Sequence, residues 1–428
     1  MSDKSAPPAT RGADLPEGLA TRRAALGLLR QVLQDGRMLS DAPWLDGAQA
    51  ARALRLAGLT LRWMGRADAV LRDRMARRPT PAVLDILRLA LAERFAGDAA
   101  PHAVVHDAVA LAKMSQRARR QAGLVNAVLR GVERADWDAA PLPRLPVWLR
   151  KQVVGAWGRA RTEAIEAAHL HGAPLDLTAK ADAARWADRL DGALLPTGSI
   201  RRDGGQVSGL AGYDTGEWWV QDAAAALPAR LLGDVAGARV LDLCAAPGGK
   251  TMQLAAAGAR VTAVDVSEGR LVRLSQNLAR TGLSARLEVA DGLRYEGGPF
   301  EAVMLDAPCT ATGTIRRHPD LPHLRSARDV EALTRLQYQL LDRALTLVRP
   351  GGAVVFCTCS LLPVEGEHQV TAALKRHPGL TAIAPDPAAW GLPPAAASAH
   401  GLRLLPDLWD DRGGMDGFYM ACLRTPSA

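Results

Sequence analysis

The 428-residue sequence contains few cysteines and no long apolar run, and each scarcity excludes a class of protein. Its five cysteines are odd in number and do not form a disulfide framework, which indicates a reducing compartment. No apolar run is long enough to span a bilayer, and the first sixteen residues lack the apolar core of a signal peptide. We therefore expect a cytoplasmic protein with no membrane segment.

Lysine is also scarce: it occurs six times, so arginine supplies nearly all of the positive charge. The formal net charge is +8 and the isoelectric point is near 9.6. Such a charge suits a polyanionic partner such as RNA, although many basic proteins bind none. Apolar residues make up 48% of the chain and charged residues 23%, as in globular proteins, and the length predicts two or three domains.

The N-terminal part of the chain predicts an all-α domain. Residues 1–16, rich in proline, alanine, serine and charge, are predicted to be disordered, and residues 17–138 to form successive helices. One apolar stripe comprises Ala25, Leu26, Leu29, Val32 and Leu33. Another helix is expected to begin with Thr80 as N-cap and Pro81 as its first residue and to stop at Gly97, and two more are expected at 102–114 and 121–134.

Three prolines, Pro141, Pro143 and Pro146, mark the end of that domain. Residues 146–230 are expected to form a small mixed α/β linker domain, with a strand at 175–179 between two helices.

Residues 231–428 alternate apolar runs with amphipathic helices, a pattern that predicts a doubly wound, Rossmann-like α/β domain. Ligands of such domains bind beyond the carboxyl ends of the strands. The strands are expected at 239–243, 260–264, 285–289, 300–305 and 352–357.

A glycine-containing loop follows the first of these strands and precedes a helix, which suits close approach of a ligand to the backbone. A tight turn without a ligand remains an alternative. A phosphate-binding loop would use Gly249, Lys250 and Thr251, but it needs a glycine at position 244, which is cysteine. The candidate cofactor-binding residues in the loop are Cys244, Ala245, Ala246, Pro247, Gly248, Gly249 and Lys250.

Two aspartates follow the next two strands. Asp265 is placed to accept hydrogen bonds from both ribose hydroxyls of an adenosyl ligand, and Asp291 to accept from the adenine amino group. Asp291 precedes a glycine, so an ordinary turn residue is an equal alternative. Because the dinucleotide fingerprint is missing, an adenosyl ligand without a pyrophosphate fits better.

Two cysteines lie at the mouths of two strands that we expect to be neighbours: Cys309 in Asp306-Ala307-Pro308-Cys309, and Cys359 in Cys357-Thr358-Cys359-Ser360. Buried inert thiols are the ordinary alternative, and no partner residues at metal-ligand spacing support a metal site. A thiolate beside an adenosyl ligand suits addition to carbon 6 of a cytosine, which makes carbon 5 electron-rich. Half ionisation at neutral pH requires ~2 kcal/mol of thiolate stabilisation, which Lys250 would help to supply. Asp306 would protonate or hydrogen-bond ring nitrogen 3.

These motifs resemble those of the RNA cytosine-5 methyltransferases of the Nol/Nop/Sun group, over nearly the whole chain. The segment Gly123 to Arg130 looks like part of that group's NusB-like RNA-binding domain. Trp218 to Asp222 looks like the lead into its catalytic domain, and the loop Cys244 to Lys250 resembles its cofactor signature. The resemblance implies a class I S-adenosylmethionine-dependent methyltransferase that acts on RNA, most specifically 16S ribosomal RNA. The sequence does not define the oligomeric state, and we expect a monomer.

The resemblance also implies roles for the cysteines. Cys359 is then the nucleophile and Cys309 assists product release, whereas chemistry alone leaves open which cysteine attacks. The loop, Asp265, Asp291 and Asp306 are implied cofactor contacts, with Lys250 near the base. Thr310 and Thr312 depart from the serine and glycine that are more usual after Pro-Cys, which could alter the fit around the base.

Recognition of RNA requires cations outside the reacting centre. The candidate phosphate contacts are Arg117, Arg119 and Arg120 in the helical domain, and Arg316, Arg317 and His318 beside the Pro-Cys loop. Two other functions remain open: transfer RNA as the substrate, or a ribosome-assembly factor that binds RNA without catalysis.

Overall fold

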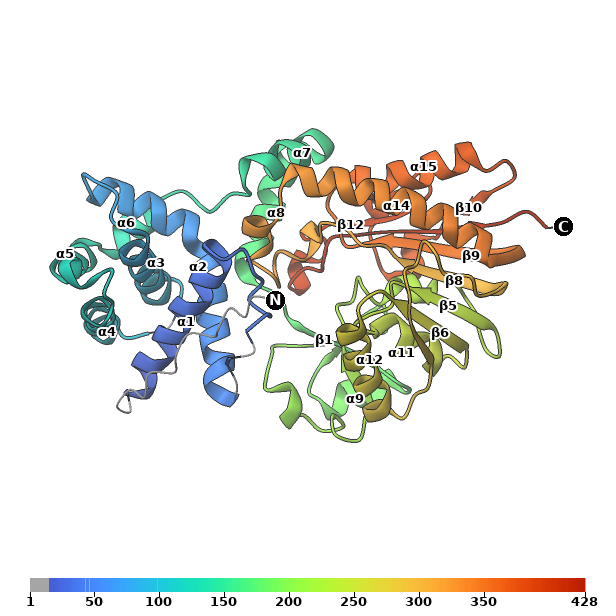
Figure 1. Cartoon of the computed structure of the whole chain (residues 1–428), viewed down its shortest axis with the longest axis horizontal. Coiled ribbons are helices and arrows are strands. Elements are labelled where there is room, and N and C mark those ends of the chain that lie inside the picture. The colour runs from blue at the N-terminus through green and yellow to red at the C-terminus, as the bar shows by residue number, and fades with distance from the viewer. Residues whose placement is uncertain (1–14, 43, 46, 98, 428) are drawn as a thin grey trace, which may run out of the picture. The chain divides into compact units, whose positions relative to one another are not determined.

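The computed structural model describes residues 15–427 except 43, 46 and 98. The predicted disordered segment, residues 1–16, therefore lies almost wholly outside the described residues. The chain forms two compact units, one ending at Arg144 and the other beginning at Leu145, which are coloured blue to green and green to red in Figure 1. No helix in the described part of the chain has the length and apolar character needed to cross a membrane.

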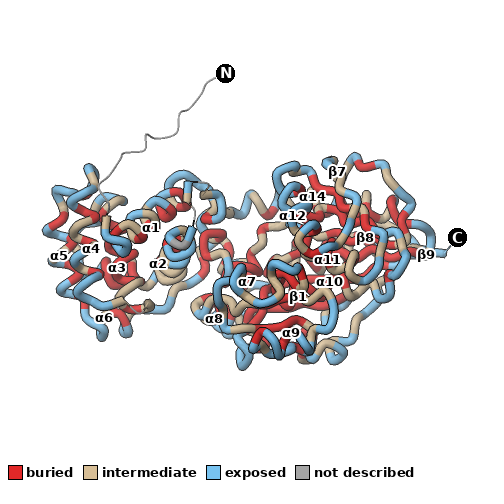
Figure 2. Tube along the Cα trace, turned by 90° about the horizontal axis from the view of Figure 1, so that it is seen from below, coloured by how far each residue is buried: buried red, intermediate tan, exposed pale blue. Residues whose placement is uncertain are grey.

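The first unit is a helical bundle, as predicted. The stripe on its first helix is confirmed, because Ala25, Leu29 and Val32 are buried. The third helix is buried on most sides and appears largely red in Figure 2. The helices are α1 (Glu17–Leu33), α2 (Gly47–Arg74), α3 (Pro81–Phe95), α4 (Pro101–Met114), α5 (Ala122–Gly131) and α6 (Arg134–Ala139).

Two details of the bundle differ from the prediction. Thr80 precedes α3 and Pro81 begins it, but the Thr80 side chain makes no capping bond, because its hydroxyl donates to the Gln121 side chain (3.3 Å). The helix expected over 121–134 ends at Gly131, and a new helix begins at Arg134 with a capping box between Glu133 and Asp136.

The second unit opens with two helices and a small sheet. The helices are α7 (Val147–Trp157) and α8 (Arg159–His171), and α9 (Ala183–Arg189) follows the first strand. The sheet has the order β2-β3-β1-β4, and its strand β1 (Leu175–Ala179) has the predicted bounds. The apolar contacts of Leu177, Trp186 and Trp218 give this sheet its own core. The other strands are β2 (Ala193–Leu194), β3 (Ile200–Arg202) and β4 (Trp218–Val220).

A nine-stranded sheet forms the rest of the unit, in the order β11-β12-β13-β9-β8-β5-β6-β7, with β10 beside β13. The five predicted strands are confirmed and run parallel to one another, from β9 in the middle of the sheet to β7 at one edge. They are β5 (Arg239–Leu243), β6 (Arg260–Asp265), β7 (Arg286–Val289), β8 (Phe300–Asp306) and β9 (Val348–Thr358). The antiparallel edge, which was not predicted, consists of β10 (Thr381–Ile383), β11 (Ala397–Ser398), β12 (Gly401–Leu404) and β13 (Phe418–Arg424).

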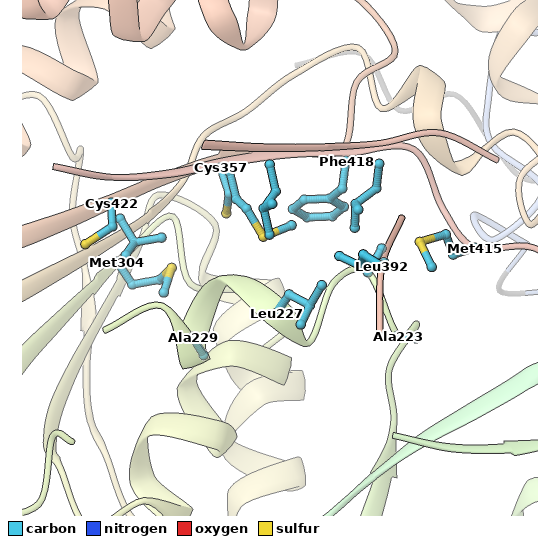
Figure 3. Close-up of a cluster of buried hydrophobic side chains, with 14 of the residues drawn as sticks. Ala223, Leu227, Ala229, Met304, Cys357, Leu392, Met415, Phe418 and Cys422 are labelled. Carbon is cyan, nitrogen blue, oxygen red and sulfur yellow. The ribbon is translucent and has the colours of Figure 1, made fainter. Parts of the chain in front are cut away.

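Helices cover both faces of this sheet (Figure 1). Val303 and Leu305 of β8 pack in the core beneath α14 and α15, whereas Met304 packs on the opposite face, which α10 and α11 cover. Figure 3 shows part of that second core, to which Cys357, Phe418 and Leu227 all belong. The helices are α10 (Leu227–Arg230), α11 (Gly249–Ala256), α12 (Glu268–Thr281), α13 (Leu321–Leu324), α14 (Ala327–Leu347) and α15 (Glu367–Arg376).

Candidate active site

The loop after β5 is tightly constrained. Cys244 and Gly248 have left-handed backbone angles (φ 65° and 107°). A Cβ at Gly248 would lie 2.0 Å from Leu274 Cδ1, so only glycine fits there. Arg270 of α12 donates to the Ala246 carbonyl (2.5 Å), which fixes the loop above the end of β5.

The lysine and threonine of this loop do not point at a phosphate site. Thr251 donates its hydroxyl to Asp242 Oδ2 (2.5 Å), deep within the fold. Burial raises the pKa of Asp242 to about 7, although the Thr251 hydrogen bond and the charge of Lys250 oppose this. Lys250 Nζ donates to Asp306 Oδ2 (2.7 Å). The phosphate-loop alternative therefore has no support in the structure.

Asp265 and Asp291 lie at the carboxyl ends of β6 and β7. Asp265 is 4% exposed and accepts from the backbone N–H groups of Ala246 (3.1 Å) and Ser267 (2.9 Å). Asp291 is half exposed and accepts from the Leu293 N–H (3.0 Å), which is the turn geometry considered above. A residue that the sequence did not single out, Val266, exposes 71% of its surface directly after Asp265.

Lys250 and Asp306 form an ion pair at the mouth of β8. Burial lowers the pKa of Lys250, but the charge of Asp306, its hydrogen bond to the lysine and the nearby Cys357 and Asp242 together outweigh burial and raise the pKa, so the lysine is charged. The Lys250 ammonium also lies 5.1 Å from the ring centre of Phe418 in β13. The other carboxylate oxygen of Asp306 accepts from the Cys357 thiol (3.6 Å). The main polar partner of Lys250 is thus Asp306.

The two cysteines meet at the ends of neighbouring strands, as expected. Cys309 Sγ and Cys359 Sγ are 3.5 Å apart, and the Gly313 N–H donates to the Cys359 carbonyl (2.9 Å). The hydrogen bond to Cys359 and burial raise the pKa of Cys309, and the charges of Cys359 and Glu365 add to this. The two thiols thus share one hydrogen bond, in which either sulfur can be the donor.

Glu365, which the sequence analysis missed, lies behind both cysteines and is fully buried. It is in the 3-10 turn Pro363–Glu365 (η4), and nothing in the sequence distinguishes it from a surface glutamate. Thr310 and Ser360, each directly after one of the cysteines, donate their hydroxyls to it. Thr310 and Thr312 are both buried, so the two departures noted above belong to this cluster.

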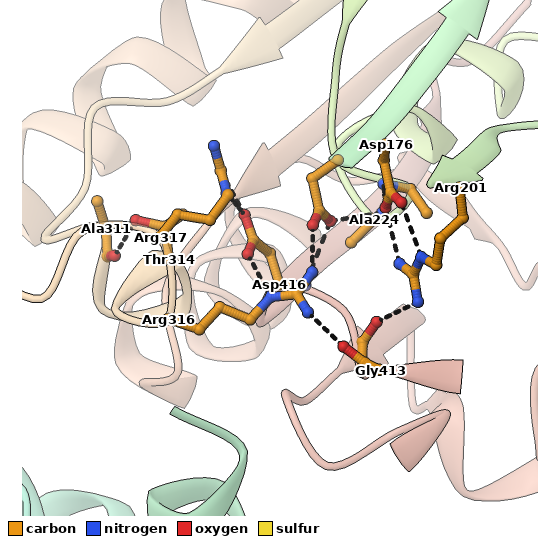
Figure 4. A network of polar contacts seen from close by, with 12 residues as sticks. Asp176, Arg201, Ala224, Ala311, Thr314, Arg316, Arg317, Gly413 and Asp416 are labelled. Atoms are coloured by element: carbon orange, nitrogen blue, oxygen red, sulfur yellow. Dashed lines mark hydrogen bonds and ion pairs between the residues drawn. The ribbon is translucent and has the colours of Figure 1, made fainter. Parts of the chain in front are cut away.

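The expectation that Arg316 contacts phosphate is wrong. Its side chain is 1% exposed and donates to Asp416 (3.0 Å) and Asp222 (2.5 Å). Figure 4 shows this network, in which Arg317 also pairs with Asp416. Arg317 retains 37% exposure, so it and His318 remain candidates. Arg316 instead joins the Pro-Cys loop to β4 and the segment before β13.

The candidate catalytic and cofactor-binding residues lie at the carboxyl ends of the parallel strands, whereas a separate cavity lies at the other end of these strands. This cavity of about 960 Å³ is lined by Arg239, Arg260 and Arg286, at the amino ends of β5, β6 and β7. No group of three or more His, Cys, Asp and Glu side chains among the described residues is arranged to hold a metal ion.

Comparison with known families defines the class of protein. Residues 229–424 match the family model described as 16S rRNA methyltransferase RsmB/F, and residues 19–134 match that of the NusB family. The chain belongs to this RsmB/F family of methyltransferases, which confirms the resemblance and the predicted fold class.

The most informative relatives are all of one kind. The chain is 37% identical to ribosomal RNA small subunit methyltransferase B of Pseudomonas syringae over 86% of this chain and 87% of that protein. It is 34% identical to the protein of the same name from Xylella fastidiosa, over 96% and 99% of the two chains.

Solved structures support the fold alone. The crystal structure of PH0851 superposes with a TM-score of 0.74 at 22% identity, over 96% of this chain and 100% of that one. A methyltransferase homologue from Pyrococcus horikoshii superposes with a TM-score of 0.53 at 24% identity, over 71% and 99%.

Proposed function

We propose that this protein transfers a methyl group from S-adenosylmethionine to carbon 5 of a cytosine in 16S ribosomal RNA, with Cys359 as the nucleophile. The observation that carries the proposal is the pair of sulfurs, 3.5 Å apart, at the mouths of β8 and β9 in a fold of the RsmB/F family. Two neighbouring thiols suit a reaction in which one thiol forms a covalent bond to the base and the other donates a proton.

The residues at the ends of β5, β6 and β7 fit an adenosyl cofactor. Asp265 offers a buried carboxylate at the position where ribose hydroxyls bind in such folds, and the exposed apolar face of Val266 suits the adenine ring. The loop Cys244 to Lys250, Asp291 and Asp306 complete the proposed contacts. When bound, S-adenosylmethionine supplies the methyl group as an electrophilic methyl sulfonium.

The first chemical step is the addition of the Cys359 thiolate to carbon 6 of the cytosine. A carbon–sulfur bond forms, the carbon 5–carbon 6 double bond opens, and its electron pair makes carbon 5 nucleophilic. Negative charge builds toward ring nitrogen 3. Asp306 and Lys250, paired at 2.7 Å, are placed to protonate or hydrogen-bond that nitrogen.

The last steps restore the aromatic ring. After methylation a water molecule accepts the proton on carbon 5, the electrons of that carbon–hydrogen bond reform the double bond, and the carbon–sulfur bond breaks with its electron pair going to the Cys359 sulfur. Because its pKa is raised, Cys309 is protonated at neutral pH and donates to the sulfur that leaves carbon 6. That is the role in product release that we assign to it.

The target base must leave its stack before Cys359 reaches carbon 6, which costs a few kcal/mol and favours unpaired sites. We assign RNA capture to the helical unit, whose Arg117, Arg119 and Arg120 side chains are exposed. Arg317 and His318 stay candidates beside the cysteines. The protein acts as a cytoplasmic monomer in this proposal.

The experiment that tests this function uses tritiated methyl donor, purified protein and 16S ribosomal RNA, with transfer RNA as a second substrate. We expect 5-methylcytosine at one 16S position and none after Cys359→Ala. A mark on transfer RNA would redirect the substrate assignment. RNA binding without any transfer would support the non-catalytic assembly factor instead.

A further inference from the structure

Glu365 has contacts that the proposed chemistry does not use. Its Oε1 atom accepts from the Thr310 N–H (2.9 Å) and from Gln337 Nε2 (3.1 Å). Its Oε2 atom accepts from the hydroxyls of Thr310 (2.5 Å) and Ser360 (2.5 Å). A carboxylate has about four acceptor positions, so the four donors saturate it. All four hydrogen bonds to the Glu365 carboxylate thus come from three separate segments of the chain.

Those segments are the ones that carry the thiols. Thr310 follows Cys309, and Ser360 follows Cys359. Gln337 of α14 donates to the carbonyl of Pro308, directly before Cys309, as well as to Glu365. Every donor to the carboxylate therefore either adjoins a reactive cysteine or binds the residue beside one.

A second layer of hydroxyls reinforces this connection. Thr312 Oγ1 lies 3.3 Å from Ser360 Oγ and accepts from the Leu361 N–H (3.0 Å). Thr358, on the other side of Cys359, donates to the Glu365 carbonyl (3.0 Å). The residues on either side of Cys309 and of Cys359 thus hydrogen-bond to Glu365 or to Gln337, so a change in one loop must disturb the other.

We propose that Glu365 is a positioning residue for the two cysteines: its buried carboxylate binds the Cys309 loop and the Cys359 loop together, fixes the separation of the sulfurs, and places a negative charge next to the Cys309 side. Thr310 and Thr312 supply the hydroxyls that make the tether, which explains why β-branched hydroxyl residues are accommodated after Pro-Cys. The inference rests on the two-cysteine mechanism proposed above, in which the distance between the two sulfurs must allow proton donation from Cys309 to Cys359.

The charge has a chemical consequence for Cys309. A negative group beside a thiol disfavours the thiolate, and Glu365 contributes in this direction to the raised pKa of Cys309. Other groups also act on the two thiols: Arg317 and Cys357 interact electrostatically with Cys359, and a hydrogen bond from the Ala311 backbone N–H lowers the pKa of Cys309. Glu365 therefore also helps to keep Cys309 in the protonated form that product release needs.

The first experiment tests the charge. Cys309 alkylation by iodoacetamide is followed against pH by peptide mass spectrometry, in a Cys359→Ser background without RNA or cofactor. Removing the carboxylate charge with Glu365→Gln lowers the pKa of Cys309, so we expect the midpoint to move to lower pH and the rate at pH 8 to rise several-fold. The same substitution at the exposed Glu331 is the control and leaves the midpoint unchanged. An unchanged midpoint in folded Glu365→Gln would refute the electrostatic part.

The second experiment tests the tether with both cysteines present. A mild diazene oxidant removes two electrons and two protons from the thiols, forms the disulfide and becomes a hydrazine. Thr310→Val keeps the shape of the side chain but removes the hydroxyl, so we expect cross-linking to slow several-fold, with Thr310→Ser restoring it. Equal rates for Thr310→Val and wild type would overturn the tether.

Neither experiment involves methyl transfer, so each can fail or succeed independently of the proposed function. In the methylation assay, misplacing the thiols by about 1 Å costs up to about 100-fold in rate. We expect Glu365→Gln and Thr310→Val to lower kcat with little change in the KM for RNA. A loss confined to KM would assign Glu365 to RNA binding instead of thiol positioning.

Discussion

At the scale of single residues, Arg316 shows what sequence alone could not provide. It is the first of three consecutive basic residues, followed by Arg317 and His318, beside a predicted site, where an exposed phosphate contact was the natural expectation. Its partners, Asp222 and Asp416, lie 94 and 100 positions away in the chain. No local pattern connects residues so far apart, so the buried network of Figure 4 became evident only from the fold.

Replacing Arg316 with alanine should destabilise the protein and leave RNA affinity unaltered. The substitution leaves two buried carboxylates without their shared cation, which costs about 3–5 kcal/mol in comparable sites. Arg317→Ala is the control, because Arg317 is partly exposed and pairs with Asp416 alone among the carboxylates described. Urea unfolding measures the loss. Full stability together with weaker RNA binding would contradict the structural role.

The cysteines represent the opposite case at this scale. Cys309 and Cys359 each follow an apolar strand, and neighbouring parallel strands bring their ends together, so their proximity was predictable. Glu365 was not, because its turn has no periodic pattern and its four donors come from three segments. The reactive groups could thus be inferred from sequence, whereas the residue that we propose positions them could not.

At the scale of elements, the parallel strands were predicted within a few residues because each is a short apolar run bounded by a helix. The antiparallel edge was missed for a physical reason. β12 is buried throughout, including Arg403, which pairs with Glu367, so its sequence lacks the alternation of a half-exposed strand. As a result, the sequence pattern did not reveal that β13 pairs with β9.

The helical unit contains a groove that suits RNA. This cavity of about 680 Å³, lined mainly by α4 and α5, has basic residues and no carboxylate among its lining residues. Lys113, His102 and His106 line the α4 side, and Arg130 lines the α5 side. Its basic side chains are of the kind that contact the phosphates of a nucleic acid.

Replacing Lys113 and Arg130 together with alanine should weaken RNA binding, because each lost phosphate contact reduces the salt slope by about 1. Fluorescence anisotropy at several salt concentrations measures this slope. Arg72→Ala, at the exposed end of α2, is the control. If the double variant has the slope of wild type, RNA binds elsewhere, and the exposed Arg117, Arg119 and Arg120 become the next candidates.

At the scale of the whole molecule, two compact units divide the work that we propose. The helical unit matches the NusB family and would capture RNA, while the mixed sheet of the second unit collects the cofactor loop, the carboxylates and both thiols at one edge. Buried hydrogen bonds of Arg316 and Glu365 connect the loops that form this edge. All of the proposed chemistry depends on one event, the bond between Cys359 and carbon 6 of the base.

That bond can be measured directly. With S-adenosylmethionine and 16S ribosomal RNA carrying 5-fluorocytidine, the proton that must leave carbon 5 is replaced by fluorine, so the adduct cannot resolve. We expect a covalent protein–RNA complex whose cross-linked peptide maps to Cys359, and which Cys309→Ala still forms. Absence of the complex, or a cross-link at Cys309, would contradict the account.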